Sequence, residues 1–125
     1  MKRYETMEIG GKHFALALTI QSEGDIREKY GEERNVNEIL YTGNVKEICE
    51  NTIAIMEIMA NEGATYAEMF EGKFYDRTTQ EELRHMLQLA DINDVREKLT
   101  NACILAWKRD IELEEDEKNA DAPAK

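Results

Sequence analysis

The chain has 125 residues, of which 42% are apolar, and a formal net charge of -11. This length fits one domain with a single modest core, and the apolar fraction is too high for a disordered chain. The 27 Asp and Glu residues outnumber the 16 Lys and Arg residues. Because such a chain is repelled by phosphates and by anionic lipid surfaces, its charge argues against direct binding to nucleic acid or to a membrane.

A tight β-hairpin is predicted at the start of the chain, over residues 4–19. Gly10-Gly11 can supply the positive φ angles of a two-residue turn, and apolar residues then alternate with smaller or polar ones. These apolar residues are Phe14, Leu16 and Leu18. Met1-Lys2-Arg3 is not followed by the apolar run of a signal peptide, so we expect the protein to reside in the cytoplasm.

A first helix is predicted from Thr19 to about Tyr30, where Gly31 is placed to end it. The polar segment that follows, residues 31–43, contains one apolar cluster that suits a helical turn or two. The cluster consists of Val36, Ile39, Leu40 and Tyr41. We expect this connector to pack on the core.

The strongest helical segment begins at Asn44 and runs to about Asn61. Asn44 is a good N-cap, and Glu47 stands in the capping-box position. Apolar residues at helical spacing leave little of the circumference polar, so we expect a central helix buried on several sides. Its apolar positions are Val45, Ile48, Cys49, Thr52, Ile53, Ile55, Met56, Ile58 and Met59.

Three shorter patterns complete the predicted bundle. Glycines at 63 and 72 flank a separate helical piece from about Thr65 to Phe70. Another short helix starts behind Thr78-Thr79, with glutamates at the capping-box offset. A last helix is predicted to be capped by Asp91 and to run to about residue 113.

The predicted fold is therefore α+β and mostly α, with an N-terminal β-hairpin packed on a small bundle of four to five helices. We expect one globular domain over residues 1–113. Residues 114–125 are rich in acidic residues and alanine and are too polar to pack. This composition predicts an acidic disordered tail.

Patterns typical of catalytic or metal sites are missing from the sequence. His13 and His85 have no cysteine or carboxylate at metal-ligand spacing. Cys49 and Cys103 stand among apolar residues of predicted helices, which favours reduced core thiols. The glycines do not form a phosphate-binding motif. We therefore expect a protein that is not an enzyme and that uses no metal and no cofactor.

Methionines and aromatic residues are the strongest candidates for a binding surface, because methionine adapts its shape to different partners. Core filling is the alternative role for each of them. The predicted protein-binding residues are Phe14, Met56, Met59, Met69, Phe70, Phe74, Met86 and Trp107.

The residues Ile9-Gly10-Gly11-Lys12-His13-Phe14, with Leu16 and Leu18-Thr19-Ile20, resemble the opening of the tail assembly chaperones of siphophages and prophages, especially those of Gram-positive hosts. The apolar helix from Asn44 and the start Thr78-Thr79-Gln80-Glu81-Glu82-Leu83 are similar to features of that family as well. The resemblance covers roughly residues 4 to 111.

This resemblance implies a non-enzymatic morphogenesis factor of the host cytoplasm that is absent from the mature virion. Members of the family bind the long helical tape measure protein and recruit tail tube subunits around it. They can also self-associate, so the resemblance implies a possible homo-oligomer. A longer form made by translational frameshifting exists for many members, and the tail from Glu112 would then be a linker.

An acidic adaptor or inhibitor remains the alternative function. The charge of -11 would allow the chain to mimic nucleic acid and to occupy the basic cleft of a host protein. Salt separates the two interpretations, because a charge mimic loses its partner as ionic strength rises, whereas an apolar groove does not.

Overall fold

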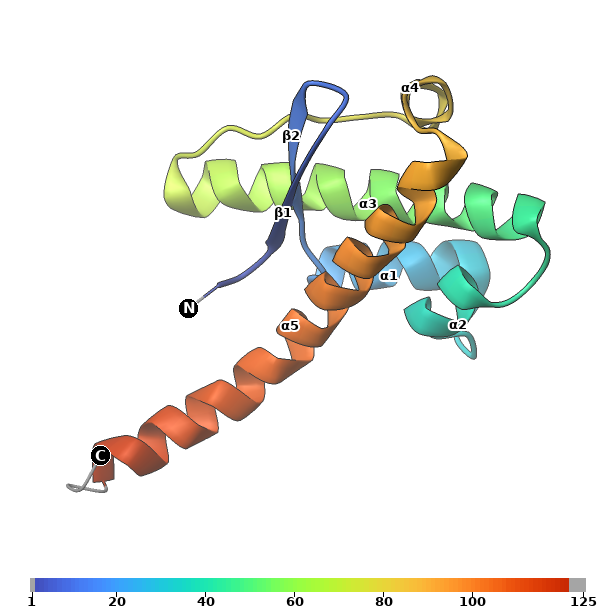
Figure 1. Ribbon diagram of the computed structural model, residues 1–125. Helices are drawn as coiled ribbons and strands as arrows, with labels where there is room; N and C mark the ends of the chain where they lie inside the picture. The colour runs from blue at the N-terminus through green and yellow to red at the C-terminus, as the bar shows by residue number, and fades with distance from the viewer. Residues whose placement is uncertain (1, 122–125) are drawn as a thin grey trace.

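The computed structural model describes the backbone of residues 2–121 and the side chains of residues 2–107. An antiparallel hairpin of β1 (Glu5–Ile9) and β2 (Lys12–Leu16) lies across the long helix α3 (Val45–Glu71) (Figure 1). The helices α1 (Ile20–Tyr30), α2 (Val36–Tyr41), α4 (Gln80–Met86) and α5 (Leu89–Asp121) surround α3. The predicted α+β, mostly helical fold with an N-terminal hairpin is confirmed.

The hairpin turn is formed by the two glycines, as predicted. Ile9 pairs with Lys12 across the turn, and Gly10 and Gly11 have φ angles of 60° and 78°, which an L side chain rarely adopts. A Cβ atom at Gly10 would also overlap the side chain of Met86. Glycine at this position therefore serves both the turn and its contact with α4.

Strand β2 is buried on both faces. Phe14 and Leu16 belong to the main core, while Ala15 and Ala17 pack in a second cluster that includes Ala67 of α3. The small residues that alternate with Phe14 and Leu16 thus face α3 rather than solvent. They are small because the strand backbone approaches the helix closely, and the Ala17 N–H donates a hydrogen bond of 3.1 Å to the Met59 carbonyl.

Helix α3 is one continuous helix of 27 residues, so the predicted break between Asn61 and Thr65 is wrong. Gly63 is a helical residue on the face crossed by β2, where a Cβ atom would overlap the carbonyl oxygen of Ala15. Its role is to allow this close approach, and not to end the helix. The helix ends at Gly72, whose φ of 65° is typical of a left-handed C-cap.

The other predicted helix starts are largely confirmed. The side chains of Thr19, Asn44 and Thr79 accept hydrogen bonds as the N-caps of α1, α3 and α4. Val45, however, is exposed at the start of α3, because the first turn of that helix extends beyond the core. Each cap is a local feature, which explains why sequence spacing could locate it.

Helix α5 differs from its predicted bounds at both ends. It begins at Leu89, so Asp91 lies in its first turn, where its carboxylate accepts a hydrogen bond of 2.8 Å from the Gln88 N–H. The helix then continues past residue 113 to Asp121 and leaves the body of the fold (Figure 1). The backbone of α5 therefore covers residues 114–121 of the segment predicted as a tail, and residues 122–125 lie outside the described part of the chain.

The core lies between the hairpin and the helices. Its largest fully buried side chains are Phe14, Leu16, Ile26, Ile39, Leu40, Ile55, Met56, Met59, Leu83 and Leu99. Within residues 2–121, no helix combines the length and the apolar character needed to cross a membrane.

Candidate functional site

Ile20, the first residue of α1, is the most exposed of the large apolar residues whose side chains the structure describes. It is 94% exposed. The inward face of α1 is set by Ser22 and Ile26, both fully buried. At about 100° per residue, Ile20 lies about 200° around the helix from Ser22. Its side chain is therefore held on the outer face of the helix.

Two hollows meet at Leu18 and Ile20. The larger one, of about 780 Å³, lies between α1 and α5 and includes Ala106 and Trp107 in its lining. The smaller one, of about 380 Å³, extends from Ile20 toward the C-terminal half of α3 and is lined by Met69 and Phe70. Because the two hollows share residues 18–20, they lie side by side on the surface.

We call these two adjoining hollows together the apolar groove. Its apolar lining consists of Leu18, Ile20, Tyr66, Met69, Phe70, Ala106 and Trp107. Trp107 and Phe70 are 72% and 69% exposed, and the Phe70 ring is supported by Tyr66, at 5.1 Å between ring centroids. Large apolar side chains gathered in an open hollow are typical of an interaction surface.

Charged residues line the wall of the groove on the α1 side. Glu23, Glu28 and Glu32 are accompanied there by one arginine, Arg27. The Arg27 Nε atom lies 2.7 Å from a carboxylate oxygen of Glu23, so its charge is balanced by that partner. The remaining two carboxylates give this wall an acidic character.

The structure separates the predicted binding residues into two groups. Met69, Phe70 and Trp107 line the groove. Phe14, Met56 and Met59 are fully buried, so their predicted part in a binding surface is wrong: these side chains fill the core beneath the hairpin. Their burial follows from the position of β2 across α3.

Two further predicted residues lie elsewhere. Met86 is partly buried against the core and contacts the hairpin turn at Gly10. Phe74 is 80% exposed, on the connector after α3, and does not line the groove. Two lining residues were not among those predicted: Ile20, which is exposed, and Leu18, which is half-buried against the core. The available signal was the helical spacing of Ser22 and Ile26, which places Ile20 on the opposite side.

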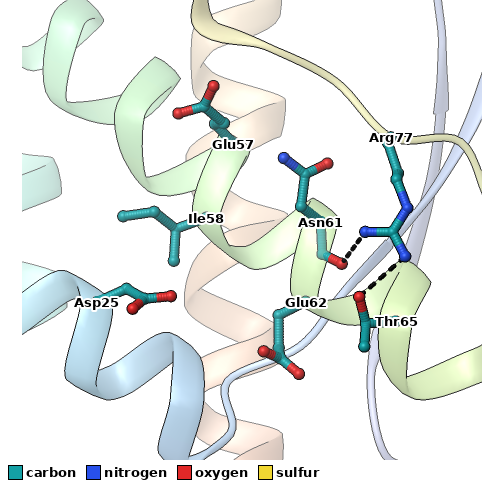
Figure 2. A pocket seen from close by; sticks show the side chains of 7 residues that line it. All are labelled: Asp25, Glu57, Ile58, Asn61, Glu62, Thr65 and Arg77. Carbon is teal, nitrogen blue, oxygen red and sulfur yellow. Dashed lines mark hydrogen bonds between the residues drawn. The ribbon is translucent and has the colours of Figure 1, made fainter. Parts of the chain in front are cut away.

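A separate polar pocket of about 300 Å³ lies between α1, α3 and the connector at 73–79 (Figure 2). Arg77 reaches from the connector to α3, where its guanidinium donates to the Asn61 carbonyl at 3.2 Å and to the Thr65 hydroxyl at 2.9 Å. The Asn61 amide bonds both the N–H and the carbonyl of Thr78, each at 2.9 Å. These groups hold the connector in place.

Glu62 borders both the polar pocket and the groove. Burial raises the pKa of its carboxyl, and the nearby carboxylate of Asp25 raises that pKa further. Both effects disfavour the ionised form.

Histidine, cysteine and carboxylate side chains are the groups from which a metal or catalytic site would be built. Within the described residues, no group of three or more His, Cys, Asp or Glu side chains could hold a metal ion. Cys103 is a free thiol whose pKa is raised to about 12, mainly by burial. A thiol with such a pKa is a poor nucleophile near neutral pH.

Comparison with protein-family models, with characterised proteins and with solved structures gives no match for this chain. The functional argument therefore depends on the groove and on the residues that surround it.

Proposed function

We propose that this chain is a non-enzymatic binding protein that covers an apolar helical segment of a partner, and that it acts as a phage tail assembly chaperone. The partner is the tape measure protein, around which tail tube subunits are recruited in the cytoplasm of the bacterial host. The single observation that carries the binding function is the open apolar groove around Ile20, Phe70 and Trp107.

The shape and chemistry of the groove favour a helical partner. Its lining comes from side chains of α1, α3 and α5 together with the 18–19 link. An extended peptide would bring unpaired backbone N–H and C=O groups against this apolar lining, which is unfavourable. A helix pairs these groups internally and presents side chains alone, as in other helix-in-groove complexes.

The identity of the partner rests on the sequence resemblance to tail assembly chaperones. A long helical protein with an apolar stripe aggregates unless the stripe is covered, and an acidic chain would keep the complex dispersed. The charge of -11 agrees with such a role. Self-association of the chaperone remains part of the proposal.

The charge also favours a second candidate function, that of an acidic adaptor or inhibitor of a basic host protein. The acidic wall of the groove, with Glu28 and Glu32, would then be the recognition surface. Such a complex depends on Coulomb attraction and is weakened by salt.

The test is co-expression of the chain with the products of its neighbouring genes, above all any long helical one, followed by affinity capture at 50 mM and 500 mM salt. We expect capture of the long helical product at both salt concentrations and an increase in its soluble fraction. Salt-sensitive capture of a basic host protein instead would replace the chaperone function with the adaptor function.

A matched pair of variants assigns the capture to the groove. Ile20 and Val45 are both exposed apolar residues at the first position of a helix, but only Ile20 lines the groove. We expect Ile20→Asp to abolish the capture and Val45→Asp to preserve it. Equal capture by the two variants would contradict the assignment.

A further inference from the structure

Charge is distributed unevenly around the apolar groove. The hollow beside Trp107 is lined by Glu23 and Glu28 of α1 and by Glu32 just after that helix, and the arginine in its lining is paired with Glu23. The hollow beside Met69 and Phe70 has Arg3 and Glu62 in its lining. One end of the groove is thus acidic along one wall, while the other end is nearly balanced in charge.

We infer that the groove selects an amphipathic helix whose apolar stripe is flanked on one side by lysine or arginine. This inference rests on the proposed function and specifies the chemistry of the segment that is bound. The apolar stripe would lie on Ile20 and Trp107, and the basic flank would face Glu28 and Glu32. Long basic side chains suit this position, because their aliphatic parts cover apolar surface while their charged ends reach the carboxylates.

Charge also argues against a second copy of this chain as the occupant. Each copy carries a formal charge of -11, so a second copy seated in the groove would bring further negative charge against Glu28 and Glu32, and self-association would use another surface. An acidic or uncharged helix would cover Glu28 and Glu32 without offering a positive charge to pair with their carboxylates. A basic flank is the complement that removes this penalty.

The chain contains its own probe for the test, because Trp107 is its one tryptophan and lies in the groove. We would titrate the full chain with three helical peptides and follow Trp107 fluorescence. The first peptide has a leucine stripe flanked by lysine, the second has the same stripe flanked by glutamate, and the third has the lysine peptide's composition with the stripe scrambled. None of the peptides contains tryptophan.

We expect the lysine-flanked peptide to bind about tenfold more tightly than the glutamate-flanked one at 50 mM salt, as two partly exposed ion pairs at Glu28 and Glu32 would give. The preference should shrink at 500 mM salt because the exposed charges are screened. The scrambled peptide should leave the Trp107 emission unchanged. Equal affinity for the two striped peptides would overturn the inference.

Charge reversal gives a sharper readout. In the double variant Glu28→Lys, Glu32→Lys, the preference should invert, so that the glutamate-flanked peptide binds more tightly. Glu28 is an exposed residue of α1, away from its buried positions Ser22 and Ile26, and Glu32 is exposed just after the Gly31 cap, so the fold should persist, and circular dichroism would verify this. A preference that stays with the lysine peptide in this variant would contradict the inference.

The remaining outcomes separate this inference from the proposed function. Capture of the tape measure protein, prevented by Ile20→Asp, together with failure of both striped peptides to bind would overturn the inference and leave the proposed function standing. Sedimentation provides a further check on the occupant. A dimer that Ile20→Asp dissociates would place a second copy in the groove and would overturn the inference as well.

Discussion

The core beneath the hairpin and the apolar groove contain the same kinds of side chain but differ in what covers them. Met59 and Phe70 both lie on α3 and are eleven residues apart, which is about three helical turns, so they occupy nearly the same face of the helix. Met59 is fully buried and Phe70 is 69% exposed. The difference arises because β2 crosses α3 near Met59 and Gly63, and Phe70 lies beyond the crossing.

This comparison shows that residue type did not decide which apolar side chains form the core. The position of the hairpin along α3 decided it, and that position depends on backbone contacts between Ala15, Ala17 and the helix. The part of α3 beneath β2 is covered by the strand, and the part beyond the strand contributes side chains to the exposed apolar groove. Four changes test this distinction, from the largest expected effect to the smallest.

The first change compares a methionine in each region. Met59→Ala should lower the free energy of unfolding by about 2–5 kcal/mol, because the lost side chain leaves a cavity in the closed core. Met69→Ala should change it by less than about 0.5 kcal/mol, since Met69 is 68% exposed. Urea unfolding followed by circular dichroism measures both. Similar losses in the two variants would contradict the division into core and groove.

The second change tests the crossing itself. Gly63→Ala places a methyl group against the Ala15 carbonyl, so the strand must shift, and we expect a loss of about 3 kcal/mol. Gly24 in α1 is the matched control, because a Cβ atom there meets nothing within 4 Å. Gly24→Ala should stabilise the protein by about 0.5–1 kcal/mol. If Gly63→Ala proved stabilising too, the close approach of strand and helix would be wrong.

These glycines also show which part of the fold was predictable from the sequence. Caps such as Asn44 and Thr79 are recognised from three or four neighbouring residues, and they were located correctly. Gly63 was interpreted from its low helix propensity, which amounts to about 1 kcal/mol. The packing of β2 on α3 outweighs this penalty, and sequence spacing does not reveal that packing.

The groove was only partly predictable for a related reason. Its lining comes from three segments distant in sequence, around Ile20, Phe70 and Trp107. Methionine and aromatic residues pointed to the second and third segments. Ile20 stood in a predicted helix and was not among the predicted binding residues, because the buried face of that helix is set partly by a serine, Ser22, which an apolar pattern overlooks.

The third change loosens the connector that borders the polar pocket. Asn61→Ala removes the partner of both the N–H and the carbonyl of Thr78, which is 5% exposed. A loss of about 2 kcal/mol is expected, since buried backbone groups are left unpaired. Hydrogen exchange at the Thr78 amide should accelerate as well. Asn101→Ala, at an exposed position of α5, should change neither the stability nor the exchange rate of the Thr78 amide.

The smallest effect is expected at the edge between the polar pocket and the groove. Because the pKa of Glu62 is raised in the folded protein, its contribution to stability is fully present below the pKa of the unfolded chain and is lost as the pH rises through the folded pKa. Glu62→Gln removes this loss. The variant should therefore be more stable than the wild type at pH 7, by less than about 1 kcal/mol.

At pH values below about 4, where glutamate is protonated in both states, the two proteins should have equal stability. Thermal unfolding at pH 3.5 and at pH 7 provides the measurement. Glu68→Gln, on the exposed face of the same helix, controls for the loss of one negative charge from an acidic chain. If Glu68→Gln reproduced the gain at pH 7, relief of general repulsion would explain the effect. A gain confined to Glu62→Gln would instead indicate that the boundary of the groove is desolvated, as contact with an apolar helix requires.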